Sequence, residues 1–529
     1  MKTLYYNGTA YDGSQMAEAF IVEDGHFIFC GSNHEAEKYG YDEKTDLKGQ
    51  FVCAGFNDSH LHLLNLGQSL MSARLAEHTD SLRGMMNYVR EFRNSHDYSS
   101  GQWLTGRGWN QDYFTDVTRM PSRKDIDDVV NDIPVVLTRA CGHSCVVNTR
   151  ALEVCGITED TVSPDGGAID YENGLFFDNA IDLISRRKPL PSETEIENMI
   201  IEACRLLNSY GITSVQSDDY CVFREIPFEV INEAYRKLER EGRLSVRVYE
   251  QSNFTDLKEL RRFVEAGNVT GKGTEFFKIG PLKMLGDGSL GSRTAYLSRP
   301  YNDDPSTRGL PLFSDEQMNA MLEYANNHGM QIAVHAIGDG CLDQVMNAID
   351  RALKKKPVKD HRHGIVHCQL SRADQLERIA ELNLHVYAQS IFLDYDNHIV
   401  YDRAGEQLAM TSYSWKTLMK KGVTVSNGSD APVEMPDVMK GIECAVTRTS
   451  MDGTGPYLKN EAFTVREAID SFTKASAFAS FEESFKGMIR EGYLADFVVL
   501  ERNPFMAKEN ELHDIKVSET YVNGKKVFG

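Results

Sequence analysis

Short apolar runs, separated by longer stretches of helical character, recur along most of the chain. Eight of these runs are rich in β-branched and aromatic residues, as buried parallel strands are. From the second run on, most successive starts are about 20 to 55 residues apart, the spacing of repeated strand–helix units. The sequence therefore predicts an α/β fold, a (β/α)₈ TIM barrel. In chain order the runs are "FVCAGFNDSH", "GITSVQS", "RLSVRVYEQ", "FFKIGPLKMLGDG", "GMQIAVHAIGDG", "HGIVHCQL", "LHVYAQ" and "GVTVSNGSD".

The first interval between runs breaks this regularity. Roughly 130 residues separate His62 from the helix that precedes Gly211, too many for one crossover connection. We therefore expect a large insertion after the first barrel strand, at approximately 68–195, within a barrel domain of residues 55–481.

The two ends of the chain share a different pattern. "TLYYNGTAYDG" near the start and "SETYVNGKKVFG" near the end alternate apolar residues with Asn-Gly and Asp-Gly turns, which is typical of hairpin-rich β structure. Chain ends commonly lie close together in space. Residues 1–54 and 482–529 are therefore expected to build one composite β-sandwich domain.

Composition narrows the classes of partner. Lys and Arg number 57 against 78 Asp and Glu, a formal charge of −21, so the mean field repels phosphate backbones and anionic membrane surfaces. The first residues lack a targeting pattern, and no apolar stretch has the length of a membrane helix. Ten scattered cysteines do not suggest a disulfide scaffold. We expect a soluble cytoplasmic protein without nucleic-acid or membrane partners.

The stretch "AGFNDSHLHLLNLG" places two histidines directly after an apolar run. Side chains alternate along a strand, so His60 and His62 leave the same face. At the carboxyl end of a barrel strand, that face can look into the mouth where barrel enzymes build their sites. Two neutral imidazoles there suit Zn²⁺ or another borderline divalent metal. Alone, the pair is a weak signal, because histidine has many ordinary roles.

Later runs repeat the placement. His335 ends the fifth run, His367 ends the sixth, and Asp430 follows the eighth. Core packing alone does not account for four histidines and an aspartate at corresponding strand ends. This agreement favours a metal centre over ordinary buried histidines.

A lysine in the fourth run adds a further candidate. Lysines are usually solvated, but Lys283 could be held neutral by burial and take up CO₂. The resulting carbamate would offer two oxygens to bridge two metals. Lys278 is the alternative, although five residues place it on the opposite face of an ideal strand.

Two other clusters fit a metal site less well. His361 and His363 precede their strand and are expected at the opposite end of the barrel. Cys141, His143 and Cys145 lack a fourth zinc ligand, so core thiols and a pocket histidine are the expectation there.

These motifs resemble the amidohydrolase superfamily, and within it the YtcJ-like branch (amidohydrolase family 3). They run in the family's order along nearly the whole chain. The matching phrases are "GFNDSHLH", "KMLGDGSLGSRTAYLSRPY", "HAIGDG", "IVHCQLS", "GSDAPV" and "GYLADFVVL". Departures are local, in Cys53 to Asn57 and at Gly340 and Cys341, and they remove no candidate ligand.

The resemblance implies a metal-dependent hydrolase that uses one or two divalent ions, with zinc as the expected metal. The catalytic residues would be Asp430, which serves as acid/base, together with His335 and His367. His143 is expected over the pocket, and Arg293 either orients substrate or makes a structural ion pair. The implied metal ligands are His60, His62, His335, His367, Asp430 and a carboxylated, bridging Lys283.

The expected reaction is hydrolysis of a non-peptide C–N bond in a small amide, N-acyl or cyclic amide compound. Activated water would attack the carbonyl, with Asp430 taking the proton and returning it to the departing nitrogen. The amide preference comes from the resemblance. The alternatives are a metal-dependent esterase or deaminase and, from another class, a non-catalytic barrel scaffold. A homodimer is one candidate assembly.

Overall fold

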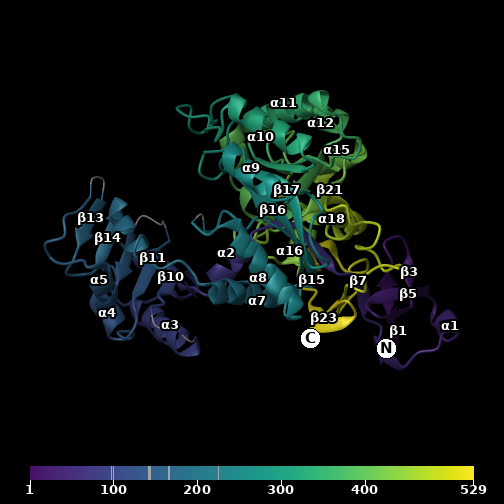
Figure 1. Ribbon diagram of the computed structural model, residues 1–529, viewed down its shortest axis with the longest axis horizontal. Helices are drawn as coiled ribbons and strands as arrows, with labels where there is room; N and C mark the ends of the chain where they lie inside the picture. The colour runs from purple at the N-terminus through teal and green to yellow at the C-terminus, as the bar shows by residue number, and fades with distance from the viewer. Residues whose placement is uncertain (97, 99–100, 141–143, 165–166, 224) are drawn as a thin grey trace. The chain divides into compact units, whose positions relative to one another are not determined.

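The structure is a computed structural model that describes residues 1–96, 98, 101–140, 144–164, 167–223 and 225–529 (Figure 1). Its contacts divide the chain into two compact units. The first comprises Met1–Leu63 and Ala203–Gly529, and the second comprises Leu64–Glu202. The expected insertion, approximately 68–195, falls within the second unit.

An eight-stranded parallel sheet forms the centre of the first unit. Its strands follow one another in chain order, so each strand pairs with the next, and each of the eight apolar runs supplies one strand. This topology confirms the predicted (β/α)₈ barrel. The strands are β8 (Phe56–Leu61), β15 (Ile212–Ser217), β16 (Arg247–Asn253), β17 (Phe277–Leu285), β18 (Ile332–Ala336), β19 (Gly364–His367), β20 (His385–Ala388) and β21 (Val425–Asn427).

Amphipathic helices connect successive strands and cover the outside of the sheet (Figure 1). The longest of them within the first unit, α11 (Asp339–Lys355), buries Leu342, Val345, Met346 and Ile349, whose spacing of three and four residues lines one helix face. The other connecting helices are α8 (Phe228–Arg240), α9 (Leu257–Glu265), α10 (Asp315–Asn327), α12 (Ala373–Glu381) and α15 (Trp415–Lys420).

The remaining helices follow β20 and β21, the last two barrel strands. They are α13 (Leu393–Asp396), α14 (Val400–Ala409), α16 (Val438–Thr447), α17 (Val465–Ser471) and α18 (Lys474–Ala479), with 3₁₀ turns η4 (Ser390–Phe392), η5 (Lys459–Glu461) and η6 (Glu509–Glu511). Among the described residues, none of the helices combines the length and the apolar character that a membrane crossing requires.

Side-chain and loop hydrogen bonds join the two edge strands of the barrel sheet, β8 and β21. The Asp58 carboxylate accepts from the Ser429 N–H at 3.0 Å and from its Oγ at 2.6 Å. Burial raises the pKa of Asp58 to about 7, although hydrogen bonds from Ser429 oppose that shift. At Gly428, a Cβ would meet Asp58 Oδ1 at 2.5 Å and the His60 nitrogen at 2.7 Å. Only glycine therefore allows this close approach.

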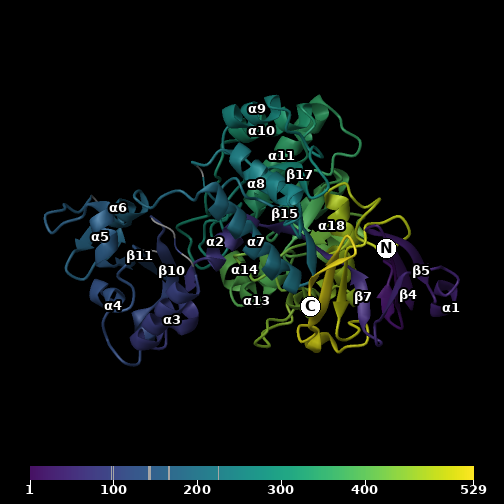
Figure 2. The same cartoon turned by 60° about the horizontal axis from the view of Figure 1, so that its bottom comes forward.

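Strands from both ends of the chain share one hydrophobic core in the first unit. Antiparallel pairing of β7 (Phe51–Ala54) with β22 (Phe497–Leu500) joins the two termini (Figure 2). Their sheet has the order β24-β23-β22-β7-β2-β3, and a second sheet has the order β5-β4-β1-β6. Stacking of Phe497 on Tyr521, with ring centroids 4.3 Å apart, is typical of the core between them.

The remaining elements of these two sheets are short. They are β1 (Lys2–Tyr6), β2 (Thr9–Tyr11), β3 (Met16–Ala17), β4 (Ala19–Glu23), β5 (His26–Gly31), α1 (Asn33–Ala36), β6 (Glu43–Asp46), β23 (Val517–Val522) and β24 (Lys525–Phe528).

The second unit has a sheet and a core of its own. Six strands pair in the order β13-β14-β12-β11-β10-β9. The fully buried Trp109 donates its indole N–H to the Leu137 carbonyl at 2.9 Å, which satisfies the only polar atom of that side chain. The elements are α2 (Leu63–Leu70, which begins one residue before the unit), β9 (Ala73–Arg74), η1 (Leu75–His78), α3 (Leu82–Ser95), β10 (Leu104–Trp109), η2 (Gln111–Tyr113), α4 (Arg123–Asp127), β11 (Val135–Arg139), β12 (Ser144–Val147), α5 (Thr149–Cys155), β13 (Gly167–Asp170), β14 (Leu175–Asp178), η3 (Asn179–Ile181), α6 (Asp182–Ser185) and α7 (Glu193–Ser209, which continues into the first unit).

Candidate metal centre

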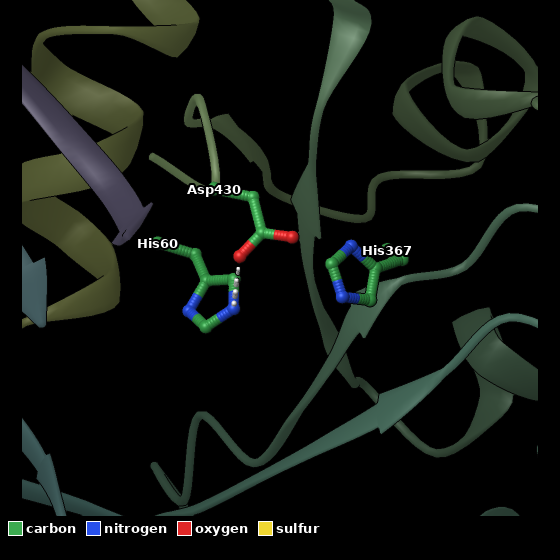
Figure 3. Close-up of side chains that lie close together, drawn as sticks. All are labelled: His60, His367 and Asp430. Carbon is green, nitrogen blue, oxygen red and sulfur yellow. Dashed lines mark ion pairs between the residues drawn. The ribbon is translucent and has the colours of Figure 1, made fainter. Parts of the chain in front are cut away.

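The carboxyl ends of three barrel strands bring together His60, His367 and Asp430. One ligand atom from each residue lies within 4.8 Å of the other two, and all three residues are buried. The Asp430 carboxylate extends between the two imidazole rings, with one oxygen toward each (Figure 3). Two imidazole nitrogens and a carboxylate oxygen are a donor set that suits Zn²⁺ and similar divalent ions.

Two residues of this group adopt an unusual backbone conformation. Asp430 has φ +60° and His367 has φ +76°, in the left-handed region that residues other than glycine rarely enter. Such a conformation costs on the order of 1–3 kcal/mol and persists only where the surrounding contacts hold it. Strain of this kind concentrates at functional sites.

The surroundings of the Asp430 carboxylate favour its ionised form, which can bind a cation. Asp430 Oδ1 lies 3.3 Å from His60 Nε2 and 3.1 Å from His62 Nε2. This buried oxygen receives no hydrogen bond of good geometry from the described residues, and a metal ion would satisfy it. Burial opposes ionisation of Asp430, but the His60 and His62 contacts outweigh it and hold its pKa well below the usual range. Asp430 is therefore anionic.

The histidines differ in charge. Burial, with the nearby Lys283 as a second cause, lowers the pKa of His60 to about 4, and burial beside His335 lowers that of His367 well below its ordinary value. Burial also acts against a charge on His62, but the contact with Asp430 raises its pKa well above the usual value. His60 and His367 are thus neutral, which is the form that coordinates metals, and His62 would release a proton on binding one.

Neighbouring side chains and a carbonyl orient three of these rings. His60 Nδ1 lies 2.7 Å from Gln251 Oε1, and His367 Nδ1 lies 2.7 Å from Gln389 Oε1. His62 Nδ1 lies 2.9 Å from the Asp218 carbonyl oxygen. A proton on each Nδ1 leaves Nε2 as the free donor atom, the usual arrangement behind metal-binding histidines.

His335 lies at the other end of a row of four imidazoles. Along the row His62, His60, His367 and His335, neighbouring ring centroids are 5.3, 5.5 and 4.5 Å apart. The Nε2 of His335 lies 3.0 Å from the Gly288 carbonyl oxygen, so this atom is held by the backbone. His335 thus lies beside the His60, His367 and Asp430 group without sharing its three converging atoms.

The two candidate lysines have different surroundings. Lys283 is fully buried, and its Nζ lies 3.3 Å from Asp218 Oδ2 at the site. Lys278 pairs with Glu482 at 2.6 Å instead. Lys283 is therefore the candidate lysine whose partner, Asp218, also contacts the His62 ring through its carbonyl oxygen.

The sequence analysis missed a second group of donor atoms. His62, Asp218 and Cys221 bring ligand atoms within 4.8 Å of one another. A signal for the latter two was present, because "DDYC" directly follows the second apolar run, near the strand end that marked His60 in the first. Gln251 and Gln389 were also missed, since their roles depend on contacts between strands that no sequence spacing encodes.

Of the two predicted substrate contacts, the structure describes Arg293 and not His143. Arg293 donates from Nε and Nη2 to the Asp303 carboxylate, at 3.1 and 2.8 Å. Of the two roles expected for this arginine, substrate contact and structural ion pair, the structure contains the ion pair. His143 and its neighbour Cys141 lie outside the described residues.

The second H-x-H pair precedes β19, at the strand end away from His367. His361 and His363 are buried, and His363 Nε2 lies 3.0 Å from Asn326 Oδ1. Burial lowers the pKa of both histidines. Their contacts are those of core histidines.

Comparisons with known proteins agree with one another. The model of the amidohydrolase family matches residues 43–528. The chain is 34% identical to the protein named "Putative amidohydrolase YtcJ" of Bacillus subtilis (strain 168), over 100% of this chain and 99% of that one. It is 23% identical to an N-substituted formamide deformylase of Arthrobacter pascens, over 96% and 94% of the two chains.

Among solved structures, the chain is similar to an uncharacterized metal-dependent hydrolase from Pyrococcus furiosus. The TM-score is 0.78 at 29% identity, and the match covers 96% of this chain and 100% of that one.

Proposed function

Because the chain belongs to the amidohydrolase family, we propose that it hydrolyses a non-peptide C–N bond in a small amide, N-acyl or cyclic amide compound. The observation that carries this proposal is the buried Asp430 carboxylate between His60 and His367, at the carboxyl ends of the barrel strands. The N-substituted formamide deformylase among its relatives, although only 23% identical, supports the choice of bond.

The residues at this site fit a divalent metal, with zinc as the first candidate. His60, His62, His367 and Asp430 would hold it, and His335, whose ring centroid lies 4.5 Å from that of His367, would be a further ligand. When bound, such an ion supplies Lewis acidity that polarises a carbonyl and acidifies water.

Asp430 is the proposed acid/base. Its low pKa keeps it ionised, so it can accept a proton from water, and its Oδ2 lies outside the contacts with His60 and His62. The proton held on Oδ2 would then pass to the departing nitrogen. His60 and His367 would stay neutral and fixed by Gln251 and Gln389 while this happens.

Lys283 has two candidate states. As a carbamate it would bridge two ions, as the family resemblance implies. As an ammonium it would pair with Asp218, the contact that the structure contains. His143 is the other candidate substrate contact, and Arg293 would be one only if it exchanged its ion pair with Asp303 for the substrate.

Two features support the proposed cellular location and the proposed size of the substrate. The nine cysteines in the described part of the chain are all free thiols, which supports a cytoplasmic location. The buried site at a barrel mouth supports a small molecule as substrate.

One panel of compounds tests the proposal. N-formyl, N-acyl, cyclic amide, ester and aminopurine compounds are each incubated with zinc-loaded and chelator-treated protein. We expect zinc-dependent turnover of at least one of the first three classes. Turnover confined to esters or aminopurines would reject the C–N hydrolysis of amides, and equal turnover after metal removal would reject the metal requirement.

A further inference from the structure

A helical segment that follows β20 presents an apolar side near the candidate metal centre. The segment consists of η4, α13 and the turn before α14, and its buried side carries Leu393 and Asp396. Phe392, Tyr395 and Ile399 recur at spacings of three and four residues and share a different side. Phe392 and Ile399 are half-buried, and Tyr395 is 58% exposed.

This apolar side begins at a candidate metal ligand. The Phe392 ring lies nearly parallel to the His367 imidazole, with an angle of 17° between the rings and 5.7 Å between their centroids. Stacking uses the face of a ring and leaves the nitrogen atoms at its edge free. Phe392 therefore lies beside the candidate metal centre without occupying a donor atom.

The other end of the same side reaches the loop that follows β17. A Cβ added at Gly291 would lie 3.8 Å from Tyr395 Cε1 and 4.0 Å from Ile399 Cδ1. These are ordinary van der Waals distances, so the loop backbone passes close to both side chains. Because Gly291 has no side chain, the space beside Tyr395 and Ile399 stays open at this point.

The last barrel strand adds an apolar residue next to Asp430. The N–H of Val433 donates to the Asp430 carbonyl at 2.9 Å, and Val433 is 66% exposed. The charge of Asp394, which lies between Phe392 and Tyr395 in the sequence, is balanced by Lys440 at 2.6 Å. Two members of the metal centre, His367 and Asp430, thus each have an apolar neighbour that water can reach.

We propose that Phe392, Tyr395, Ile399 and Val433 form an apolar wall that binds an uncharged alkyl or aryl substituent of the substrate. The inference rests on the proposed function and narrows its substrate class. Since the wall starts at His367 and Asp430, a group attached near the scissile bond is the occupant within reach.

The chemistry of the wall decides which substituents it accepts. Apolar surface that is exposed to water gains free energy when another apolar group covers it. A charged substituent would lose hydration there and gain no ion pair from these four side chains. The wall should therefore select amides with a benzyl or similar group over those with a methyl group or a carboxylate.

Four compounds test the wall with zinc-loaded, full-length protein. N-methylacetamide is the reference, N-benzylacetamide and N-methyl-phenylacetamide extend it on the nitrogen and on the acyl side, and N-acetylglycine carries a charge. Values of kcat/KM and bound zinc are measured for wild type, Phe392→Ala and Tyr395→Ala. Tyr39→Ala is the matched control, because Tyr39 is an exposed aromatic residue that packs on Phe29 in the terminal sheets.

We expect wild type and Tyr39→Ala to favour at least one benzyl compound over N-methylacetamide about tenfold or more in kcat/KM, and to disfavour N-acetylglycine. Phe392→Ala and Tyr395→Ala should each reduce the preference at least about threefold and retain bound zinc. A general loss of structure would lower all four values together. Since Tyr395 is largely exposed, its truncation tests the wall even if Phe392→Ala fails to fold.

Binding is measured separately from turnover. Saturation-transfer NMR of the same compounds with zinc-loaded Asp430→Asn protein, alone and combined with Tyr395→Ala, reports contact between compound and protein where the chemical step is slow. The benzyl group should receive the strongest transfer, and Tyr395→Ala should weaken it.

The failures of the two proposals are distinguishable. Equal kcat/KM for methyl and benzyl compounds, or a preference that survives in both wall variants, would overturn the inference and leave the proposed function intact. If none of the four compounds is hydrolysed, binding decides: transfer to the benzyl group that depends on Tyr395 would support the wall, and its absence would overturn it. The proposed function itself would fall only if the wider panel also showed no zinc-dependent hydrolysis of an amide.

Discussion

Asp430 contacts His60 twice across the seam between the first and last barrel strands. Its N–H donates to the His60 carbonyl at 2.8 Å, and its Oδ1 lies 3.3 Å from the His60 Nε2. The backbone bond that helps close the barrel therefore also sets the distance between two candidate metal ligands. The same contact between the first and last barrel strands therefore helps to close the barrel and to assemble the site.

Removing the ionised oxygen of Asp430 should impair the chemical step. Asp430→Asn keeps the shape of the side chain but cannot hold the proton, so kcat on the best amide substrate should fall about 10²- to 10⁴-fold. The measurement is kcat at saturating zinc, with bound zinc determined in parallel. Equal kcat in variant and wild type would remove Asp430 from the acid/base role.

The two glutamines behind the histidines should affect metal affinity more than folding. Gln251→Ala and Gln389→Ala each free a ring that the amide oxygen holds at 2.7 Å, so zinc should bind roughly 10- to 100-fold more weakly. Competition with a chromophoric chelator gives the affinities. Gln407→Ala, at an exposed position of α14, is the control and should bind zinc as wild type does. Unchanged affinity in both site variants would contradict the orienting role.

The seam should not tolerate a side chain at position 428. In Gly428→Ala the new Cβ would meet Asp58 Oδ1 at 2.5 Å and the His60 nitrogen at 2.7 Å, and the free energy of unfolding should fall by about 1–3 kcal/mol. Gly40→Ala adds the same atom where nothing lies within 4 Å, so it should change stability little. Denaturant unfolding of both variants checks the difference, and equal stability would contradict the close approach.

The buried ion pair of Glu482 with Lys486 should make the free energy of unfolding depend on pH. Burial opposes the charge of Glu482, but Lys486 and Lys278 outweigh it and lower its pKa from 4.5 to about 2. A depressed carboxyl pKa stabilises the folded state above pH 4.5, and this contribution is lost as the pH falls from 4.5 to 2.

Glu482→Gln should abolish that part of the pH dependence. It should also reduce the free energy of unfolding at neutral pH by roughly 3–5 kcal/mol, because it leaves a buried lysine unpaired. Unfolding free energies of wild type and variant between pH 7 and pH 3 test both effects. A variant that loses stability in acid as steeply as wild type would show that Glu482 is not the titrating group.

Sequence periodicity was enough to predict the barrel, because each apolar run is a strand buried on both faces. The same spacing placed His60, His367 and Asp430 at strand ends, and the structure brings those three side chains together. Asp218 and Cys221 follow a strand in the same way. An aspartate or a cysteine at one strand end is a weaker sign of a metal site than a pair of histidines.

Other contacts could not be read from the sequence at all. Gln251 reaches His60 across the intervening strand β15, so their contact depends on register and on the curvature of the sheet. The seam contacts join residues about 370 positions apart, and they form only once the barrel closes. Sequence spacing indicates strand ends, whereas side-chain contacts need the folded sheet.

Anomalous diffraction from zinc-loaded crystals tests the central claim most directly. We predict a zinc peak within about 2.0–2.2 Å of His60 Nε2, His367 Nε2 and an Asp430 carboxylate oxygen. A zinc-loaded crystal in which these three side chains lack a peak, or in which zinc lies only at other residues, would contradict the account.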